Sequence, residues 1–144
     1  EIAGQVTDTI VKHVAATDET STVNIPITIP SNSIGLQGAK LASVEIDYEI
    51  LVAACDAVDV IINKVTRGLN TAVAVVAVQA FSYDTGHDTA AERYTVEQHR
   101  MKCTLTNPIW IDDDEYVLVE LTLNKAATTQ VDIISAVANY TLRA

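Results

Sequence analysis

Apolar and polar side chains alternate along much of the chain, and the alternation is clearest in residues 41–62. Acids occupy one side of the pattern at Glu45, Asp47 and Glu49, while β-branched and aromatic residues occupy the other. A period of two places successive side chains on opposite faces of a β-strand. The pattern resumes at residues 58–62 after a few small residues, so the whole stretch predicts an antiparallel hairpin.

The same period predicts strands through most of the remaining chain. We expect them at residues 2–14, 23–29, 71–80, 95–106, 109–111, 117–124 and 131–142. Residues 2–14 also fit a helical period, but their β-branched side chains favour the extended form. We expect residues 82–91 to form a loop with one helical turn before Tyr94, and Asn107-Pro108 to break a strand.

Two of these strands have unusual compositions. Pro26 and Pro30 lie on the polar side of strand 23–29, and because proline has no N–H to donate, this strand is expected at a sheet edge. Residues 71–80 are almost entirely Val and Ala. A strand that is apolar on both faces is expected inside the sandwich, with its outer face covered by a loop or by a neighbouring subunit.

Residues 53–61 and 126–134 echo each other. Each segment follows a long alternating strand, turns through small residues and resumes as Val-Asp-(Val/Ile)-Ile. We interpret the two segments as hairpins with similar turns, one in each sheet.

Eight or nine strands with turn signals between them predict an all-β fold. Their number favours an antiparallel β-sandwich that is jelly-roll-like and has about eight strands. An immunoglobulin-like sandwich is the alternative, but Trp110 follows both Cys55 and Cys103 instead of lying between them. The 144 residues are expected to form one domain, with residues 31–144 as the core and residues 1–30 as an N-terminal extended arm or edge strands.

Composition narrows the function classes. The net charge is −10 and there is no basic cluster, so binding to nucleic acid or to an anionic membrane surface is not expected. No apolar run is long enough to cross a bilayer. Hydrophobic residues make up 49% of the chain and the mean hydropathy is +0.21, which indicates either a large core or apolar surface covered by other subunits.

Four adjacent acids are candidate calcium ligands. Consecutive side chains of an extended chain diverge, however, and the ligand spacing of an EF-hand loop is missing, so a solvated turn is favoured. Two buried thiols are likewise favoured over a disulfide between Cys55 and Cys103, and no Cys or His spacing predicts zinc. The four acids are Asp112, Asp113, Asp114 and Glu115.

Other titratable groups are weaker candidates. His87 with Asp88 and Glu92 could form a metal or acid–base site, although an exposed loop histidine is the favoured interpretation, and His99 is expected to be a partly buried strand histidine. The acids at positions 45, 47 and 49 have the spacing of paired carboxylates, but a glycosidase pair comes from different strands beside aromatic residues. Without any nucleophile or phosphate-binding motif, we predict no enzyme activity, catalytic residue, cofactor or metal.

The last third of the chain contains a series of strand and turn segments: Arg100–Leu105, Thr106–Trp110, Asp112–Leu118, Asn124–Thr129 and Asn139–Leu142. In texture and strand order, residues 40–144 resemble small virion structural proteins of tailed phages, of the head-decoration, cement or fibre type. The resemblance implies a jelly-roll-like, often trimeric protein on the outside of a capsid or tail. Such a protein contacts its own copies and other virion subunits, and no catalytic residue carries over.

Two other functions remain open. The chain could be a subunit of an extracellular filament, in which residues 23–29 or 2–14 complete the sheet of a neighbour. It could also be a secreted carbohydrate-binding module, which would need an exposed aromatic platform. The candidates for such a platform are Trp110, Tyr116, Tyr83 and Tyr94.

Overall fold

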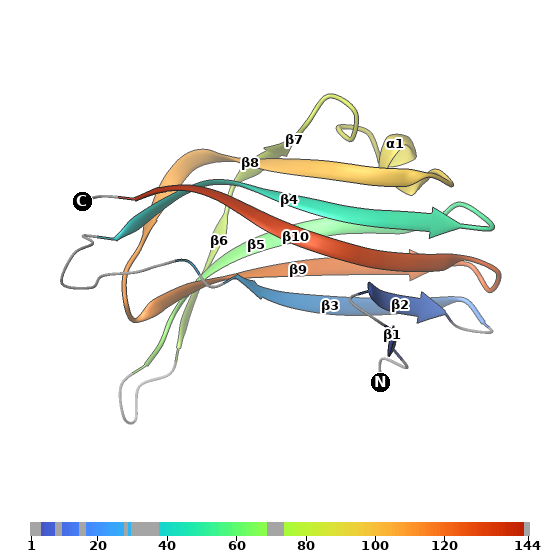
Figure 1. Cartoon of the computed structure of the whole chain (residues 1–144), viewed down its shortest axis with the longest axis horizontal. Coiled ribbons are helices and arrows are strands. Elements are labelled where there is room, and N and C mark those ends of the chain that lie inside the picture. Colours follow the sequence, from blue (N-terminus) through green and yellow to red (C-terminus); the bar gives the residue numbers. More distant parts are fainter. Residues whose placement is uncertain are drawn as a thin grey trace.

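The computed structural model describes residues 4–7, 10–14, 17–27, 29, 38–68 and 74–142. These residues form two antiparallel sheets packed face to face (Figure 1), with strand orders β1-β2-β10-β4-β8-β7 and β3-β9-β5-β6. The elements are β1 (Gly4–Thr7), β2 (Ile10–Val14), β3 (Glu19–Ile27), β4 (Ala39–Leu51), β5 (Ala57–Thr66), β6 (Val75–Gln79), β7 (Phe81–Tyr83), α1 (Ala90–Tyr94), β8 (Gln98–Ile111), β9 (Glu115–Lys125) and β10 (Gln130–Leu142). The predicted all-β sandwich is confirmed. Eight strands make two facing layers of four, and the short β1 and β7 extend one layer.

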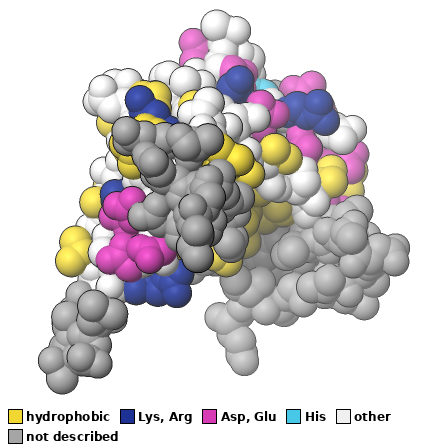
Figure 2. Space-filling view, turned by 60° about the vertical axis from the view of Figure 1, so that its left-hand side comes forward, with side chains coloured by type: hydrophobic (Ala, Val, Ile, Leu, Met, Phe, Trp, Pro, Cys, Tyr) yellow, Lys and Arg dark blue, Asp and Glu magenta, His cyan; other side chains and the backbone are white. Residues whose placement is uncertain are grey.

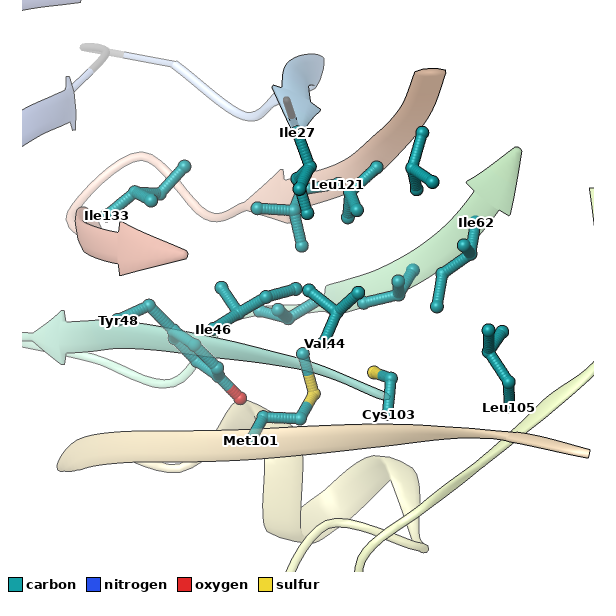
Figure 3. Close-up of a cluster of buried hydrophobic side chains, with 14 of the residues drawn as sticks. Ile27, Val44, Ile46, Tyr48, Ile62, Met101, Cys103, Leu105, Leu121 and Ile133 are labelled. Atoms are coloured by element: carbon teal, nitrogen blue, oxygen red, sulfur yellow. The ribbon is translucent and has the colours of Figure 1, made fainter. Parts of the chain in front are cut away.

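The period of two in the sequence is also the period of burial. In β4 the apolar side of the pattern turns inward, where Val44, Ile46 and Tyr48 are fully buried, while the intervening acids are only partly covered. Figure 3 shows Val44 and Ile46 facing Ile62 and Leu121 of the opposite sheet across the core. Thin branched side chains fill the space between two sheets well, which explains why so few aromatics are needed.

Residues 41–62 do not form the predicted hairpin. β4 belongs to the six-stranded sheet and pairs with β10 and β8, whereas β5 belongs to the four-stranded sheet and pairs with β9 and β6. The small residues 52–56 therefore carry the chain from one layer to the other. The second predicted hairpin fails in the same way, because β9 and β10 also lie in different sheets.

The sequence echo marks two crossovers that touch each other. Asp56 N donates to the Asn124 carbonyl at 2.8 Å, and the Thr129 hydroxyl donates to the Ala54 carbonyl at 3.1 Å. A third crossover joins β2 to β3 and includes Asp18, whose carboxylate accepts from Ala127 N at 2.9 Å. All three crossovers lie at the same end of the sandwich, on the right in Figure 1.

Two local predictions meet different outcomes. The helical turn before Tyr94 is confirmed as α1. The break at Asn107-Pro108 is wrong, because β8 continues to Ile111. Its pairing with β4 jumps from Ser43↔Thr104 to Leu41↔Ile109, and the intervening residues of β8 turn toward β7, where Thr106 N donates to the Ala80 carbonyl at 2.9 Å. A bulge thus accommodates the proline without ending the strand.

The N-terminal 30 residues contribute edge strands in their described parts. β1 and β2 lie at one edge of the six-stranded sheet, and β3 lies at the edge of the four-stranded sheet, where Pro26 was expected. Both cysteines are buried and free. Among the described residues no helix could span a membrane.

Val52 begins the crossover after β4 with φ = 75°, a left-handed conformation that costs a β-branched residue about 1–2 kcal/mol. Its side chain is 77% exposed, so little packing depends on it. We expect Val52→Gly to raise the free energy of unfolding by about 1 kcal/mol, measured by urea titration. The matched control is Val96→Gly, at an exposed valine without positive φ, which should lower stability because glycine loosens the unfolded chain. A Val52→Gly protein that is less stable than wild type would contradict the claim that the left-handed conformation of Val52 is strained.

Candidate functional site

On the side away from β9, none of the described strands lies beside the first half of β5, and side chains cover that half instead. β6 pairs only with Ile62–Thr66, which leaves the outward backbone groups of the preceding residues without a ladder partner. The Tyr83 hydroxyl accepts from Val60 N at 3.2 Å, and Arg93 Nε donates to the Val58 carbonyl at 3.2 Å. These two side chains protect an exposed sheet edge in the way that another strand would.

Arg93 is the centre of this cap and is only 7% exposed. Its Nη1 donates to the His87 carbonyl at 2.9 Å, its Nη2 lies 3.1 Å from Asp59 Oδ1, and the guanidinium stands 4.3 Å from the Tyr83 ring centre. Burial acts to lower the pKa of Arg93, but the Asp59 carboxylate and the neighbouring tyrosines more than offset this, so the charge is kept. The position of Arg93 is set by α1, whose N-terminus is closed by a capping box between Thr89 and Glu92.

Two histidines lie beside this cap. His87 Nδ1 is 2.8 Å from Asp84 Oδ1, His87 Nε2 is 3.2 Å from His99 Nδ1, and His99 Nε2 is 3.0 Å from the Thr95 carbonyl oxygen. The predicted exposed loop position of His87 is wrong, because the residue is only 9% exposed and faces Asp84 and His99 instead of Asp88. Asp88 is exposed, and Glu92 is committed to the capping box. His99 is buried, more deeply than expected.

Tyr48 closes the inner side of this cluster. Its ring is stacked on His99 with centres 4.5 Å apart, and its hydroxyl donates to the Arg93 carbonyl at 2.9 Å. Burial raises the pKa of Tyr48 far above its ordinary value, and it raises the pKa of Cys103 to about 12 and that of Cys55 to about 11. Both cysteines therefore remain thiols at neutral pH, which makes them poor nucleophiles.

The outer acids of β4 form cross-strand pairs. Asp47 lies 2.9 Å from Arg100 and accepts from the Ser135 hydroxyl at 2.7 Å, and Glu45 lies 3.8 Å from Lys102. The Ser135 bond is the main cause of a lowered pKa at Asp47, with Arg100 adding to it. A hollow of about 300 Å³ lies here, lined by Asp47, Gln98, His99 and Arg100. Asp47 and Glu45 each have their own cation on β8, so these two acids form ion pairs across the strands instead of a pair of carboxylates.

The calcium candidates occupy the turn between β8 and β9. Glu115 is tied to Lys64 at 2.7 Å and accepts from Asp112 N at 3.0 Å, while the side chains of the other three acids are exposed. Among the residues that the structure describes, no group of three or more His, Cys, Asp or Glu side chains is placed to hold a metal ion.

The edge strand β6 is the largest departure from the sequence prediction. Instead of lying inside the sandwich, it is exposed on both faces, with Val75, Val76 and Val78 at 64%, 58% and 72% exposure. It has no charged residue and no proline, and the strand pairs only with β5. The expected cover for its apolar faces is not supplied by the described residues.

The other described edges carry features that discourage pairing. β1 has four residues and β7 has three, while β3 contains Pro26. β10 extends beyond β2, but its ladder to β4 has two register shifts in that region. Short strands, prolines and bulges are the usual devices that keep sheet edges from joining, and β6, although only five residues long, has no proline and no register shift in its ladder to β5.

The surface charge is mixed where it can be seen. On the face shown in Figure 2, Lys and Arg side chains lie beside Asp and Glu, and they do not form a separate basic area. Comparison of the chain with protein-family models, curated proteins and solved structures found no match.

Sequence reasoning missed the cap on β5. Arg93 was not singled out because a surface helical turn is its usual place, and no periodicity reports that a guanidinium will replace a strand. The Thr89–Glu92 capping box was the available signal, since Thr-x-x-Glu marks a helix start four residues before Arg93.

We expect Arg93→Met to lower the free energy of unfolding by about 3 kcal/mol, because the Val58 and His87 carbonyls and Asp59 all lose their donor. Urea titration measures the change. Arg100→Met is the matched control, since Arg100 has one carboxylate partner and a side chain that is 75% exposed, and its loss should stay within about 1 kcal/mol. Equal losses in the two variants would contradict the structural role of Arg93.

Acid stability should depend on Glu115. Burial acts to raise its pKa, but Lys64, Asp112 N and Thr66 outweigh this, so the pKa lies below its ordinary value of 4.5. A lowered pKa adds stability that is present above the ordinary value and is lost as the pH falls through the folded one. We expect Glu115→Gln to lose less stability than wild type between about pH 5 and about pH 3. Asp113→Asn should retain the wild-type dependence of the free energy of unfolding on pH. If both variants change this dependence in the same way, Glu115 is not the group responsible.

Proposed function

We propose that the protein is a non-enzymatic structural subunit that acts through contacts with other subunits. The observation that carries the proposal is the uncovered apolar edge of β6. The chain covers half of β5 with two side chains, and its other described edges carry features that discourage pairing, yet none of the described residues covers this strand. An open apolar edge strand is a template for pairing with another chain.

The partner that fits this edge best is a second copy of the chain. A net charge of −10 makes copies repel each other, and β6 is a strand without any charge, beside Lys64 and Arg67 of the neighbouring hairpin arm. Two β6 strands paired antiparallel would place apolar side chains of both copies next to each other along a strand that carries no charge of its own. Such a contact is two-fold and closes on itself, so its smallest product is a dimer.

We propose the virion surface as the setting, with the sandwich as a jelly roll. Support comes from the nested order of the ladders, in which β2 pairs with β10, β3 with β9, β4 with β8 and β5 with β6. Jelly rolls of eight strands are common in viral capsids. A trimer, as the resemblance to phage decoration proteins implies, would need a second surface besides β6.

Two alternatives have less support. A filament subunit that donates residues 23–29 would have to release β3, which is already paired with β9 along all nine of its residues. One that donates residues 2–14 would have to release β2, which is paired with β10. A carbohydrate platform would have to use Trp110 or the half-buried Tyr116, because Tyr83 and Tyr94 are partly buried and bonded around Asp59 and Arg93.

Sedimentation equilibrium of the intact chain tests the subunit contact. We expect a concentration-dependent mass of twice the monomer for wild type and a monomer for Val76→Lys/Val78→Lys, because charges on an edge strand prevent pairing. Val137→Lys is the matched control, an exposed valine on β10, and should still dimerise. A wild-type monomer at all concentrations would contradict the proposal, and so would an assembly that Val137→Lys abolishes while the β6 variant retains it.

The virion setting has a separate test. Genes for capsid and portal proteins next to the coding sequence, together with detection of the chain in purified particles, would support it. Absence from purified particles would remove the setting and leave the β6 contact to be judged by the mass measurement.

A further inference from the structure

The outer nitrogens of the buried histidine pair both face acceptors. His99 Nε2 lies 3.0 Å from the Thr95 carbonyl oxygen, which has no proton to give, so this nitrogen is the donor. His87 Nδ1 lies 2.8 Å from Asp84 Oδ1. Which of these two groups carries the proton depends on the charge state of Asp84.

Asp84 is a carboxylate. Its oxygens accept from Lys102 N at 2.6 Å and from Gly86 N at 2.9 Å. Burial acts to raise the pKa of Asp84, but these two backbone donors and His87 more than offset it, so the pKa is lowered. The carboxylate is therefore an acceptor only, and His87 Nδ1 carries the proton between them.

The inner nitrogens then pose a problem of proton count. His87 Nε2 and His99 Nδ1 face each other at 3.2 Å. If both rings were neutral, each would have used its only proton on its outer nitrogen, and two lone pairs would meet in a buried place. A hydrogen bond in that position needs one proton more.

We propose that His87 and His99 form a proton-binding site, in which the two rings together hold three N–H protons and one positive charge. The extra proton lies between Nε2 of His87 and Nδ1 of His99. Binding adds one H⁺ from solvent to a lone pair of one ring nitrogen, and no other bond changes.

The surroundings suit one added charge. Asp84 supplies a carboxylate at contact distance, and Glu92 of α1 lies near enough to His87 to interact with it electrostatically. Arg93 of α1 is the nearest cation, and Asp59 of β5 balances it. On the sheet side Arg100 of β8 is matched by Asp47 of β4. The Tyr48 ring stacks on His99, and aromatic rings attract cations through their faces.

The added proton makes a hydrogen bond between the two rings, and this bond joins two parts of the fold. His87 belongs to the segment that runs from β7 into α1, and His99 belongs to β8. The same segment carries Arg93, which caps β5. Loss of the proton sets two lone pairs against each other, which weakens this one contact between the segment and β8.

Nitrogen-15 NMR of the intact chain counts the ring protons directly. His13→Gln removes the signals of the third histidine, so the remaining four ring nitrogens belong to the pair. At about pH 7 we expect three protonated nitrogens and one lone-pair nitrogen, which is one of the two inner nitrogens. Two lone-pair nitrogens would overturn the proposal, and so would spectra that change on addition of EDTA, because these would indicate a bound metal ion.

Asp84→Asn in the same background is the decisive variant. An asparagine whose amide nitrogen takes the Oδ1 position donates to His87 Nδ1 and gives up the bond from Gly86 N, and both rings can then satisfy the chain of hydrogen bonds while neutral. The lone pair should therefore appear on His87 Nδ1, and the total should fall from three protonated nitrogens to two. If a folded Asp84→Asn protein still has three protonated ring nitrogens, the role of the carboxylate is contradicted. If this variant does not fold, the spectrum of the His13→Gln protein alone decides the proposal.

Discussion

The structure depends on one topological constraint, which is that consecutive long strands lie in opposite sheets. The chain crosses between layers after β2, β3, β4, β6, β8 and β9, so most ladders join segments far apart in the sequence. β4 is held between β10 and β8, and β9 between β3 and β5. Non-local pairing of this kind makes folding slow, because loop closure must precede the contacts that reward it.

The same constraint decides which edges remain open. A sheet that ends must leave one row of backbone groups without a partner, and this chain treats its two neighbouring edges differently. Over the first half of β5, a tyrosine and a buried arginine positioned by a short helix make hydrogen bonds to two backbone groups. Along β6, a few residues further on, the described part of the chain supplies no cover for an apolar strand. The contrast is the physical basis for the proposal that the function resides in a subunit contact.

Strand positions could be predicted from the sequence because burial in a sandwich has the same period as the side chains of a strand. The alternation in β4 and β9 located both strands to within a few residues. Pairing could not be predicted, because a crossover and a hairpin turn use the same small residues. Residues 53–57 looked like a tight turn, and only the three-dimensional structure shows that they span two layers.

The candidate surfaces show the same difference between local features, which the sequence predicts, and tertiary contacts, which it does not. Val and Ala on both faces of residues 71–80 predicted that something covers them, but that pattern does not say whether the cover belongs to the same chain. The histidines were judged one at a time, and their sequence separation gives no sign that a loop residue and a strand residue will meet at 3.2 Å. Buried polar partners come from tertiary packing, which no local period encodes.

The most direct test of the account is hydrogen exchange of the backbone amides of Val75–Gln79 over a range of protein concentrations. If β6 pairs with a second copy, outward amides of this strand should become protected as concentration rises, while the exposed amides of other edges keep their rates. Exchange in β6 that is equally fast at every concentration, or protection that grows at another edge instead, would contradict the claim that this strand is the subunit contact.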